Sequence, residues 1–166
     1  TFYIDKKGYI WFGTIDGIYI FDPTDGKLSH YKHSRTDPFS LPNNSIWEIS
    51  EDRQSNVWIG TYSGTLCYVN IDENNAFKTY HPQNSGLNHT PVSAFAEDQQ
   101  YLWVGTEGGG INRMNKATGE FSYITSANSI TSNNIKSLIT DAGHNLWIST
   151  FMGGLDLYNV GRQKVT

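Results

Sequence analysis

The chain of 166 residues has little of several features that mark common protein classes. Cys67 is its only cysteine, so the chain can form no internal disulfide, no cysteine-based metal site and no redox pair. Twelve Lys and Arg residues stand against 16 Asp and Glu residues, without the basic cluster that nucleic-acid binding requires. No apolar run approaches the ~20 residues that span a bilayer, and no signal-peptide pattern opens the chain. If the natural protein is exported or anchored, we expect the responsible segments to lie outside these residues.

Catalytic and metal-binding motifs are also missing. The sequence has no nucleophile elbow, Walker loop, His-Glu-x-x-His or EF-hand spacing. Its five histidines are scattered, with no pair at the spacing of metal ligands. The run Gly108-Gly109-Gly110 joins two predicted strands and opens no helix, so it lacks the dipole of a phosphate-binding loop. We therefore expect no catalytic residue, no metal and no cofactor in this chain.

What the chain does have is an internal repeat. A four-residue motif, Trp followed by an apolar residue, Gly or Ser, and Thr, occurs four times. Its tryptophans, separated by 47, 45 and 44 residues, are Trp11, Trp58, Trp103 and Trp147. Self-similarity at a period of about 40 to 50 residues is typical of propellers and related repeat architectures. The repeat is therefore the structural unit of this protein.

An Asp and a polar turn precede each repeated Trp by five or six residues. These aspartates are Asp5, Asp52, Asp98 and Asp141. Asp accepts hydrogen bonds from the backbone N–H groups of a turn, so we expect a hairpin at each of them. The apolar run before this Asp predicts a first strand, over residues 1–4, 46–49, 92–95 and 135–138. The strand that carries the Trp, called the Trp strand below, is then the second.

Gly-rich turns follow the Trp strands, at Asp16-Gly17, Ser63-Gly64, Gly108–Gly110 and Gly153-Gly154. An alternating segment then predicts a third strand, over residues 18–21, 66–69, 111–114 and 155–158. A short aromatic segment predicts a fourth, over residues 28–31, 77–80 and 121–124. Four short strands per repeat without helical periodicity predict an all-β fold, a β-propeller of about four blades with four antiparallel strands each.

We expect the chain to form a single propeller segment over residues 1–166. Its repeats are predicted at approximately 1–40, 41–86, 87–129 and 130–166. One blade cannot bury both of its faces, so neighbouring blades stabilise each other. The repeated Trp side chains are expected at the seams between blades, and the four aspartates to be structural as well.

Two stretches carry a resemblance to a known family. "NNSIWEISEDRQSNVWIGTYSG" and "NNIKSLITDAGHNLWISTFMGG" resemble the two-component regulator propeller repeat along their whole length. The resemblance implies part of a seven-bladed propeller in the periplasmic sensor region of a hybrid two-component histidine kinase, of the type that Bacteroidetes use to respond to polysaccharides. It also implies an oligosaccharide ligand, signalling to polysaccharide-utilisation genes, and further blades, a membrane span and a kinase as partners within the full-length chain.

About four blades fall short of that ring. We therefore expect a fragment without enzymatic activity, whose open blade faces lead to self-association; a closed four-bladed ring is the alternative.

Candidate ligand-binding residues follow from blade topology. Because strands alternate in direction, the turn after each Trp strand and the connection that leads into each blade share one edge, called the loop rim below. Loops on a rigid scaffold carry most binding residues. Trp47 stands out because Ser93 and Lys136 replace it in other repeats, and an aromatic face suits a sugar; the alternative is that it packs between strands. The candidates are Arg35, Asn44, Trp47, Tyr62, His89, Glu107 and Phe151.

Two other functions stay open at this point. A propeller enzyme acting on carbohydrates would need two carboxylates across the scissile bond, and Asp16 and Glu107 are the two that lie near the loop rim in corresponding turns. A protein-interaction scaffold would bind a partner protein and ignore sugars.

Overall fold

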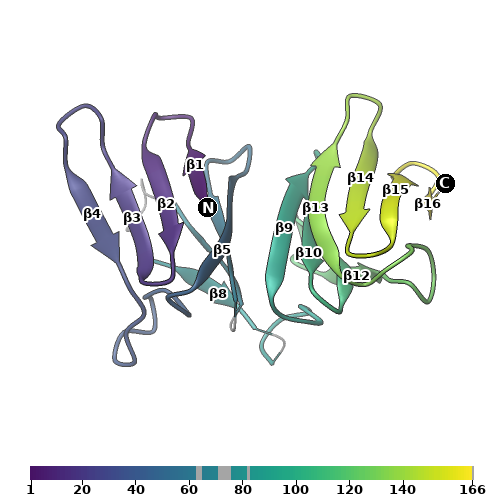
Figure 1. Cartoon of the computed structure of the whole chain (residues 1–166), viewed down its shortest axis with the longest axis horizontal. Coiled ribbons are helices and arrows are strands. Elements are labelled where there is room, and N and C mark those ends of the chain that lie inside the picture. The colour runs from purple at the N-terminus through teal and green to yellow at the C-terminus, as the bar shows by residue number, and fades with distance from the viewer. Residues whose placement is uncertain (63–64, 71–75, 82, 166) are drawn as a thin grey trace. The chain divides into compact units, whose positions relative to one another are not determined.

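The computed structural model describes residues 1–62, 65–70, 76–81 and 83–165. Every regular element in this described part is a β-strand (Figure 1). The chain divides into two compact units, residues 1–81 and 82–166. Each unit holds two four-stranded antiparallel sheets, and the two units are taken in turn.

Unit 1 contains the first two sheets. The strands of the first sheet are, in order, β1 (Phe2–Ile4), β2 (Ile10–Thr14), β3 (Gly17–Phe21) and β4 (Leu28–Tyr31). The strands of the second are β5 (Ile46–Glu51), β6 (Val57–Thr61), β7 (Leu66–Val69) and β8 (Lys78–Tyr80). Each strand pairs with its sequence neighbours, which is the topology predicted for a propeller blade.

Unit 2 repeats this arrangement. Its first sheet consists of β9 (Val92–Glu97), β10 (Tyr101–Thr106), β11 (Gly110–Asn115) and β12 (Phe121–Ile124). Its second consists of β13 (Ile135–Thr140), β14 (Asn145–Thr150), β15 (Gly154–Asn159) and β16 (Lys164–Val165). The predicted fold, four antiparallel four-stranded sheets, is confirmed. The predicted turn at Ser63-Gly64 lies outside the described residues.

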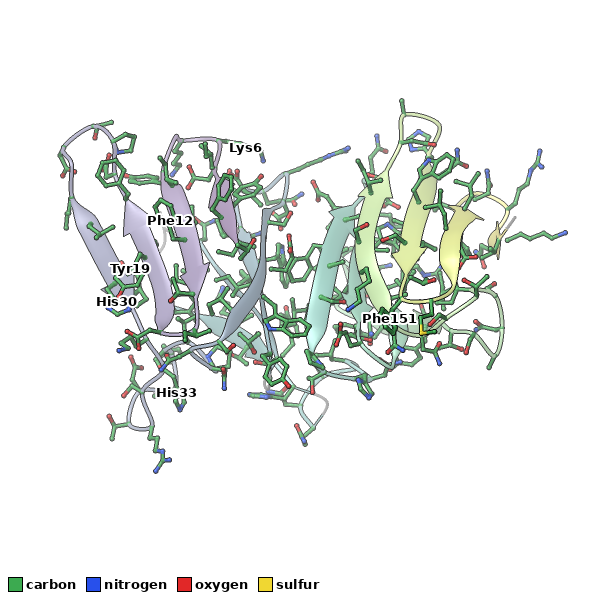
Figure 2. The ribbon with its side chains drawn as sticks, in the orientation of Figure 1. Lys6, Phe12, Tyr19, His30, His33 and Phe151 are labelled. Atoms are coloured by element: carbon green, nitrogen blue, oxygen red, sulfur yellow. The ribbon has the colours of Figure 1, made fainter. Side chains whose placement is uncertain are left out.

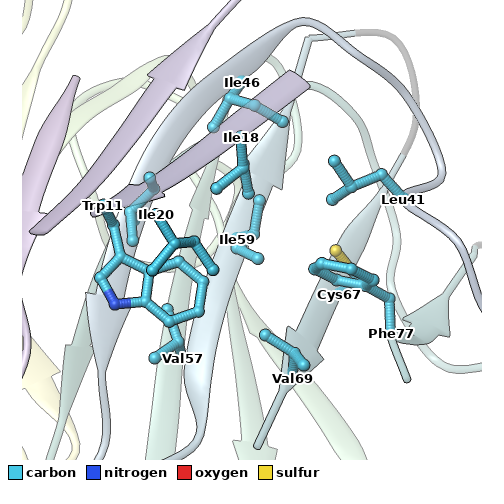
Figure 3. Packing of buried hydrophobic residues seen from close by; sticks show 11 residues of the cluster. Trp11, Ile18, Ile20, Leu41, Ile46, Val57, Ile59, Cys67, Val69 and Phe77 are labelled. Atoms are coloured by element: carbon cyan, nitrogen blue, oxygen red, sulfur yellow. The ribbon is translucent and has the colours of Figure 1, made fainter. Parts of the chain in front are cut away.

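Two of the repeated tryptophans, Trp11 and Trp103, fill the space between the neighbouring sheets of their units. In unit 1, Trp11 is wholly buried and belongs to one core cluster with Ile18 of its own sheet and Val57 and Ile59 of the next (Figure 3). In unit 2, Trp103 is wholly buried and its ring lies 5.9 Å from that of Tyr158 in the next sheet, centroid to centroid. An indole buries on the order of 200 Å², so these rings are major contributors to the packing of sheet on sheet.

Steric constraints explain why the third residue of the repeated motif is glycine in the first and third sheets. A Cβ atom on Gly105 would lie 2.6 Å from Cγ2 of Ile135, at the start of the next sheet. A Cβ on Gly13 would meet Ile46 at the same distance. Glycine therefore permits the close approach of adjacent sheets. Ser149 holds this place in the fourth sheet, where its hydroxyl lies 2.7 Å from that of Ser137.

Candidate functional site

An Asp–Trp clasp closes the first hairpin of every sheet. In the first sheet, Oδ1 of Asp5 accepts hydrogen bonds from the main-chain N–H groups of Lys7 (3.0 Å) and Tyr9 (2.9 Å). Its Oδ2 accepts the indole N–H of Trp11 at 2.9 Å. The same indole bond joins Trp58 to Asp52 (2.8 Å), Trp103 to Asp98 (3.0 Å) and Trp147 to Asp141 (2.8 Å). These carboxylates hold turns together and are not positioned to react with a substrate.

The clasp of the last sheet predicts how the stability of the protein depends on pH. Hydrogen bonds from the Asn145 main chain, the Asn145 side chain and the Trp147 indole lower the pKa of Asp141 from 3.8 to about 2. Because the folded-state pKa is the lower one, the stabilisation is complete above pH 3.8 and disappears as the pH falls toward 2. We expect Asp141→Asn to flatten the loss of stability between pH 4 and pH 2, as measured by urea denaturation. Asp25→Asn, in an exposed turn, controls for the loss of one charge, and equal pH slopes for all three proteins would contradict this account.

Main-chain hydrogen bonds assemble the loop rim at the other end of the Trp strands. In unit 1, the N–H of Gly17 donates to the carbonyl of Asn44 (2.8 Å), and that of Tyr62 to the carbonyl of Ser45 (2.9 Å). In unit 2, the N–H of Glu107 donates to Pro91 (3.0 Å) and that of Phe151 to Asn134 (2.8 Å). Each bond joins a turn after a Trp strand to a connection that enters a sheet. Within each unit, the two kinds of loop are therefore held at one edge.

A β-bulge lies at the start of the first strand in three of the sheets. In the pairing of β5 with β6, Ile46 and Glu48 have partners and Trp47 is the extra residue. Ser93 and Lys136 are the extra residues in β9 and β13. Bulges redirect a side chain and occur often beside functional sites. The three equivalent positions carry an indole, a hydroxyl and an ammonium group, and the structure gives each a different local partner.

In unit 1, the bulge produces an exposed aromatic pair. The Trp47 and Tyr62 ring centroids lie 5.0 Å apart with the ring planes tilted by 44°. Trp47 is half-buried and Tyr62 is 52% exposed. Asn44 lies three residues before Trp47, and its Oδ1 accepts the main-chain N–H of His33 at 2.7 Å. Arg35 is exposed on the same connection between β4 and β5. The aromatic pair combines packing with accessible ring surface.

In unit 2, the extra residue of the bulge in β13 is Lys136, which carries a positive charge. Lys136 forms an ion pair with Glu107, and its Nζ lies 5.4 Å from the centroid of the Phe151 ring. Phe151, labelled in Figure 2, is 53% exposed at the loop rim. His89 is exposed and lies over Gly108, where a Cβ would approach its Cε1 to 2.8 Å. Lys136 therefore links Glu107 to Phe151, whereas His89 packs against the neighbouring turn.

The two carboxylates of the enzyme alternative each have a lysine partner. Lys32 contacts Asp16 at 2.6 Å, and its hydrogen bond lowers the pKa of that carboxyl. Glu107 is paired with Lys136. A general acid needs the opposite environment, one that raises its pKa and keeps the proton on. The surroundings of Asp16 therefore do not provide the raised pKa of a general acid.

Sequence reasoning missed two residues at the loop rim. Lys136 was noted only as the equivalent of Trp47, and its partnership with Glu107 and Phe151 was not foreseen. Ile15 is 87% exposed in the turn after β2, where it follows Thr14 as Tyr62 follows Thr61. Aligning the residue directly after each motif would have found Ile15. Among the described residues, no group of three His, Cys, Asp or Glu side chains could hold a metal ion, and no helix there could cross a membrane.

Comparison with known proteins identifies the repeat. The model of the family "Two component regulator propeller" matches residues 40–63 and 86–108. Two of the four repeats thus match the two-component regulator propeller repeat. Both matched regulator propeller repeats run from a connection at the loop rim through the first strand and the Trp strand, so they include the bulge and the clasp.

Relatives of these regulator propeller repeats belong to much longer proteins. The chain is 28% identical to histidine kinase P4 of Formosa agariphila over 98% of its own length and 12% of that protein. Among solved structures, this chain superposes on the extracellular domain of the B. thetaiotaomicron hybrid two-component system BT3049 with a TM-score of 0.88 and 22% sequence identity. The superposition covers 99% of this chain and 22% of the BT3049 chain. The extracellular domain of BT4673, from the same organism, gives 0.82 over 99% and 24%, at 25% identity. The regulator propeller repeats thus span only a small part of each relative.

Proposed function

We propose that this chain is part of the extracellular, periplasmic sensor region of a hybrid two-component system, and that its loop rim binds an oligosaccharide. Its likeness to two extracellular domains of such systems supports the first part. The Trp47–Tyr62 pair carries the second part. On this proposal the segment binds without turnover, and the full-length protein passes a ligand-dependent change of conformation to its kinase and so to genes of polysaccharide utilisation.

The chemistry of the pair fits the apolar face of a sugar ring. Two tilted rings 5.0 Å apart offer a broad apolar surface without closing it. Trp and Tyr bring contact area together with a polar edge that can reach hydroxyl groups. Sites for small ligands commonly combine such aromatic walls with a few polar groups. Here Asn44, three residues before Trp47 on the same connection, supplies such a polar group.

Replacement of Trp47 tests this proposal. We expect Trp47→Ala to weaken the binding of a matching oligosaccharide about tenfold or more, because stacking on the indole is lost. The measurement is isothermal titration of the purified full sensor region with a panel of defined oligosaccharides. Tyr123→Ala removes an aromatic ring that is 43% exposed in β12 of unit 2 and is expected to leave affinity unchanged. Equal affinity of Trp47→Ala and the unaltered protein, or consumption of the saccharide, would refute the proposal.

The outer face of the first sheet supports a proposal about assembly. Phe2, Phe12, Tyr19 and His30 lie opposite one another in one row across its four strands, and the last two rings stack at 3.8 Å (Figure 2). We propose that further repeats cover this face in the full-length protein and that a second copy covers it in the isolated chain. Sedimentation velocity is expected to show concentration-dependent association that Phe12→Glu reduces and Phe39→Glu, at another exposed site, does not. A monomer at every concentration would contradict this.

A further inference from the structure

The loop rim of unit 1 also contains a hollow whose described lining includes neither Trp47 nor Tyr62. It lies between the β4–β5 connection and the end of β8 and has a volume of about 440 Å³. Sites for small ligands commonly measure about 300 to 1,000 Å³. Its polar lining includes His33, Arg35, Asp37, Ser40, Thr79 and His81. Figure 2 shows His33 on this connection, at the edge of the unit where the loops gather.

The connection that walls the hollow is folded onto itself and tied to the second sheet. The Ser40 hydroxyl lies 2.8 Å from the carbonyl of Asp37 and accepts the N–H of Ser34 at 2.9 Å. The N–H of Phe77 donates to the carbonyl of Phe39 at 2.8 Å, just before β8 begins. These bonds fix the wall before any ligand arrives, which lowers the entropic cost of binding.

Hydrogen-bond donors face the hollow without protein partners. Among the residues that the structure describes, neither the Arg35 guanidinium nor the Thr79 hydroxyl bonds another protein group. Nδ1 of His33 lies 2.7 Å from the carbonyl oxygen of Leu41, so this nitrogen carries the hydrogen and donates it. Asp37 is the single carboxylate among the described residues of the lining, and its Oδ1 accepts the N–H of Phe39 at 2.9 Å. The Arg35 guanidinium and the Thr79 hydroxyl are therefore donors that the described lining leaves for a ligand.

We propose that this hollow binds an oxyanion carried by the saccharide ligand, either a sugar carboxylate or a sulfate ester. The guanidinium of Arg35 presents a planar fork of donors that matches two oxygens of such a group, and charge-assisted bonds of this kind are the stronger ones. Thr79 adds a neutral donor from the adjacent strand. This assignment rests on the proposed function because it names the chemical class of the saccharide.

A titration followed by nuclear magnetic resonance tests the assignment. The full sensor region, ¹⁵N-labelled, is titrated with sodium sulfate, with trigalacturonate and with neutral galactotriose. Both anions are expected to shift the amide signals of residues 33–42 and 79–81. Arg35→Gln is expected to weaken both about tenfold or more, and Asp37→Asn to strengthen them, because it removes the opposing charge and keeps the oxygen that accepts from Phe39. Arg53→Gln, in the β5–β6 turn of the same unit, is the matched control.

The outcomes separate this inference from the proposed function. Anion-dependent shifts that Arg35→Gln removes and Arg53→Gln keeps support it. A response to sulfate but not to trigalacturonate supports the oxyanion site and overturns the sugar carboxylate as the group that it binds. If neutral galactotriose shifts Trp47 and Tyr62 while neither anion affects residues 33–42, the inference fails and the sensor proposal stands. If sulfate binds at the hollow and no saccharide binds anywhere, the oxyanion site is supported, and the proposal that the sensor binds an oligosaccharide is refuted.

Discussion

Trp103→Ala is expected to lower the free energy of unfolding by about 3–5 kcal/mol, the range for removing a large aromatic side chain from a core. The ring is wholly buried, lies 5.9 Å from the ring of Tyr158 in the next sheet and has the Arg113 guanidinium at the same distance from its centroid. Its removal opens a cavity between two sheets and leaves Asp98 without the indole N–H. Urea denaturation followed by circular dichroism measures the loss.

Trp147→Ala is the matched control for this prediction. Trp147 occupies the same position of its strand and makes the same bond to its aspartate, but it is half-buried. Part of its ring already faces solvent, so we expect a clearly smaller loss than for Trp103. If Trp103→Ala does not fold, Trp103→Phe replaces it. We expect its free energy of unfolding to be lower than that of the unaltered protein. Equal stability of Trp103→Phe and the unaltered protein would contradict the role given to the indole.

The strands could be predicted because four repeats report the same pattern. A single alternating segment such as 66–69 is weak evidence for a strand, but the same alternation after four aligned tryptophans is strong evidence. The prediction of residues 46–49 as a first strand therefore differs from the observed β5, Ile46–Glu51, only at its end. The short fourth strand at residues 28–31 agrees with β4, Leu28–Tyr31.

The chemistry of the loop rim was less accessible to sequence reasoning. The sequence showed that Trp47, Ser93 and Lys136 are equivalent, but not that each is the extra residue of a bulge. That property depends on the pairing of two residues of β5 with one of β6, which is a feature of the backbone register. The ion pair of Lys136 with Glu107 joins residues 29 positions apart in different sheets. Such contacts depend on how sheets approach one another, which periodicity does not specify.

The hollow beside Arg35 illustrates the same limit. Arg35 and Asn44 were selected because they lie on a connection at the loop rim, and the structure gives them different surroundings. The Oδ1 of Asn44 accepts the main-chain N–H of His33. Arg35 instead lines the hollow, and Thr79 of β8 contributes to the same lining. The contribution of Thr79 could not be foreseen, because it comes from a strand more than 40 residues away whose register sets which side chains face the connection.

Asp52→Ala is expected to lower the free energy of unfolding by about 3 kcal/mol, because buried donors left unsatisfied cost about 1–3 kcal/mol each. Asp52 is 3% exposed, and its Oδ2 accepts the indole N–H of Trp58, which is 4% exposed. Its Oδ1 accepts the N–H groups of Gln54 and Asn56, both at 2.9 Å. Water can still reach the turn, so the indole N–H is the donor for which the loss is largest.

Two further variants separate this clasp from a general effect of removing a carboxylate. Asp25→Ala deletes an aspartate whose Oδ1 accepts one main-chain N–H in an exposed turn, and we expect a loss below about 1 kcal/mol. Asp52→Asn keeps an oxygen for the turn but sets an amide nitrogen against the Trp58 N–H, so its stability should lie between Asp52→Ala and the unaltered protein. If Asp52→Ala cost no more than Asp25→Ala, the clasp would be a consequence of the fold and not one of its causes.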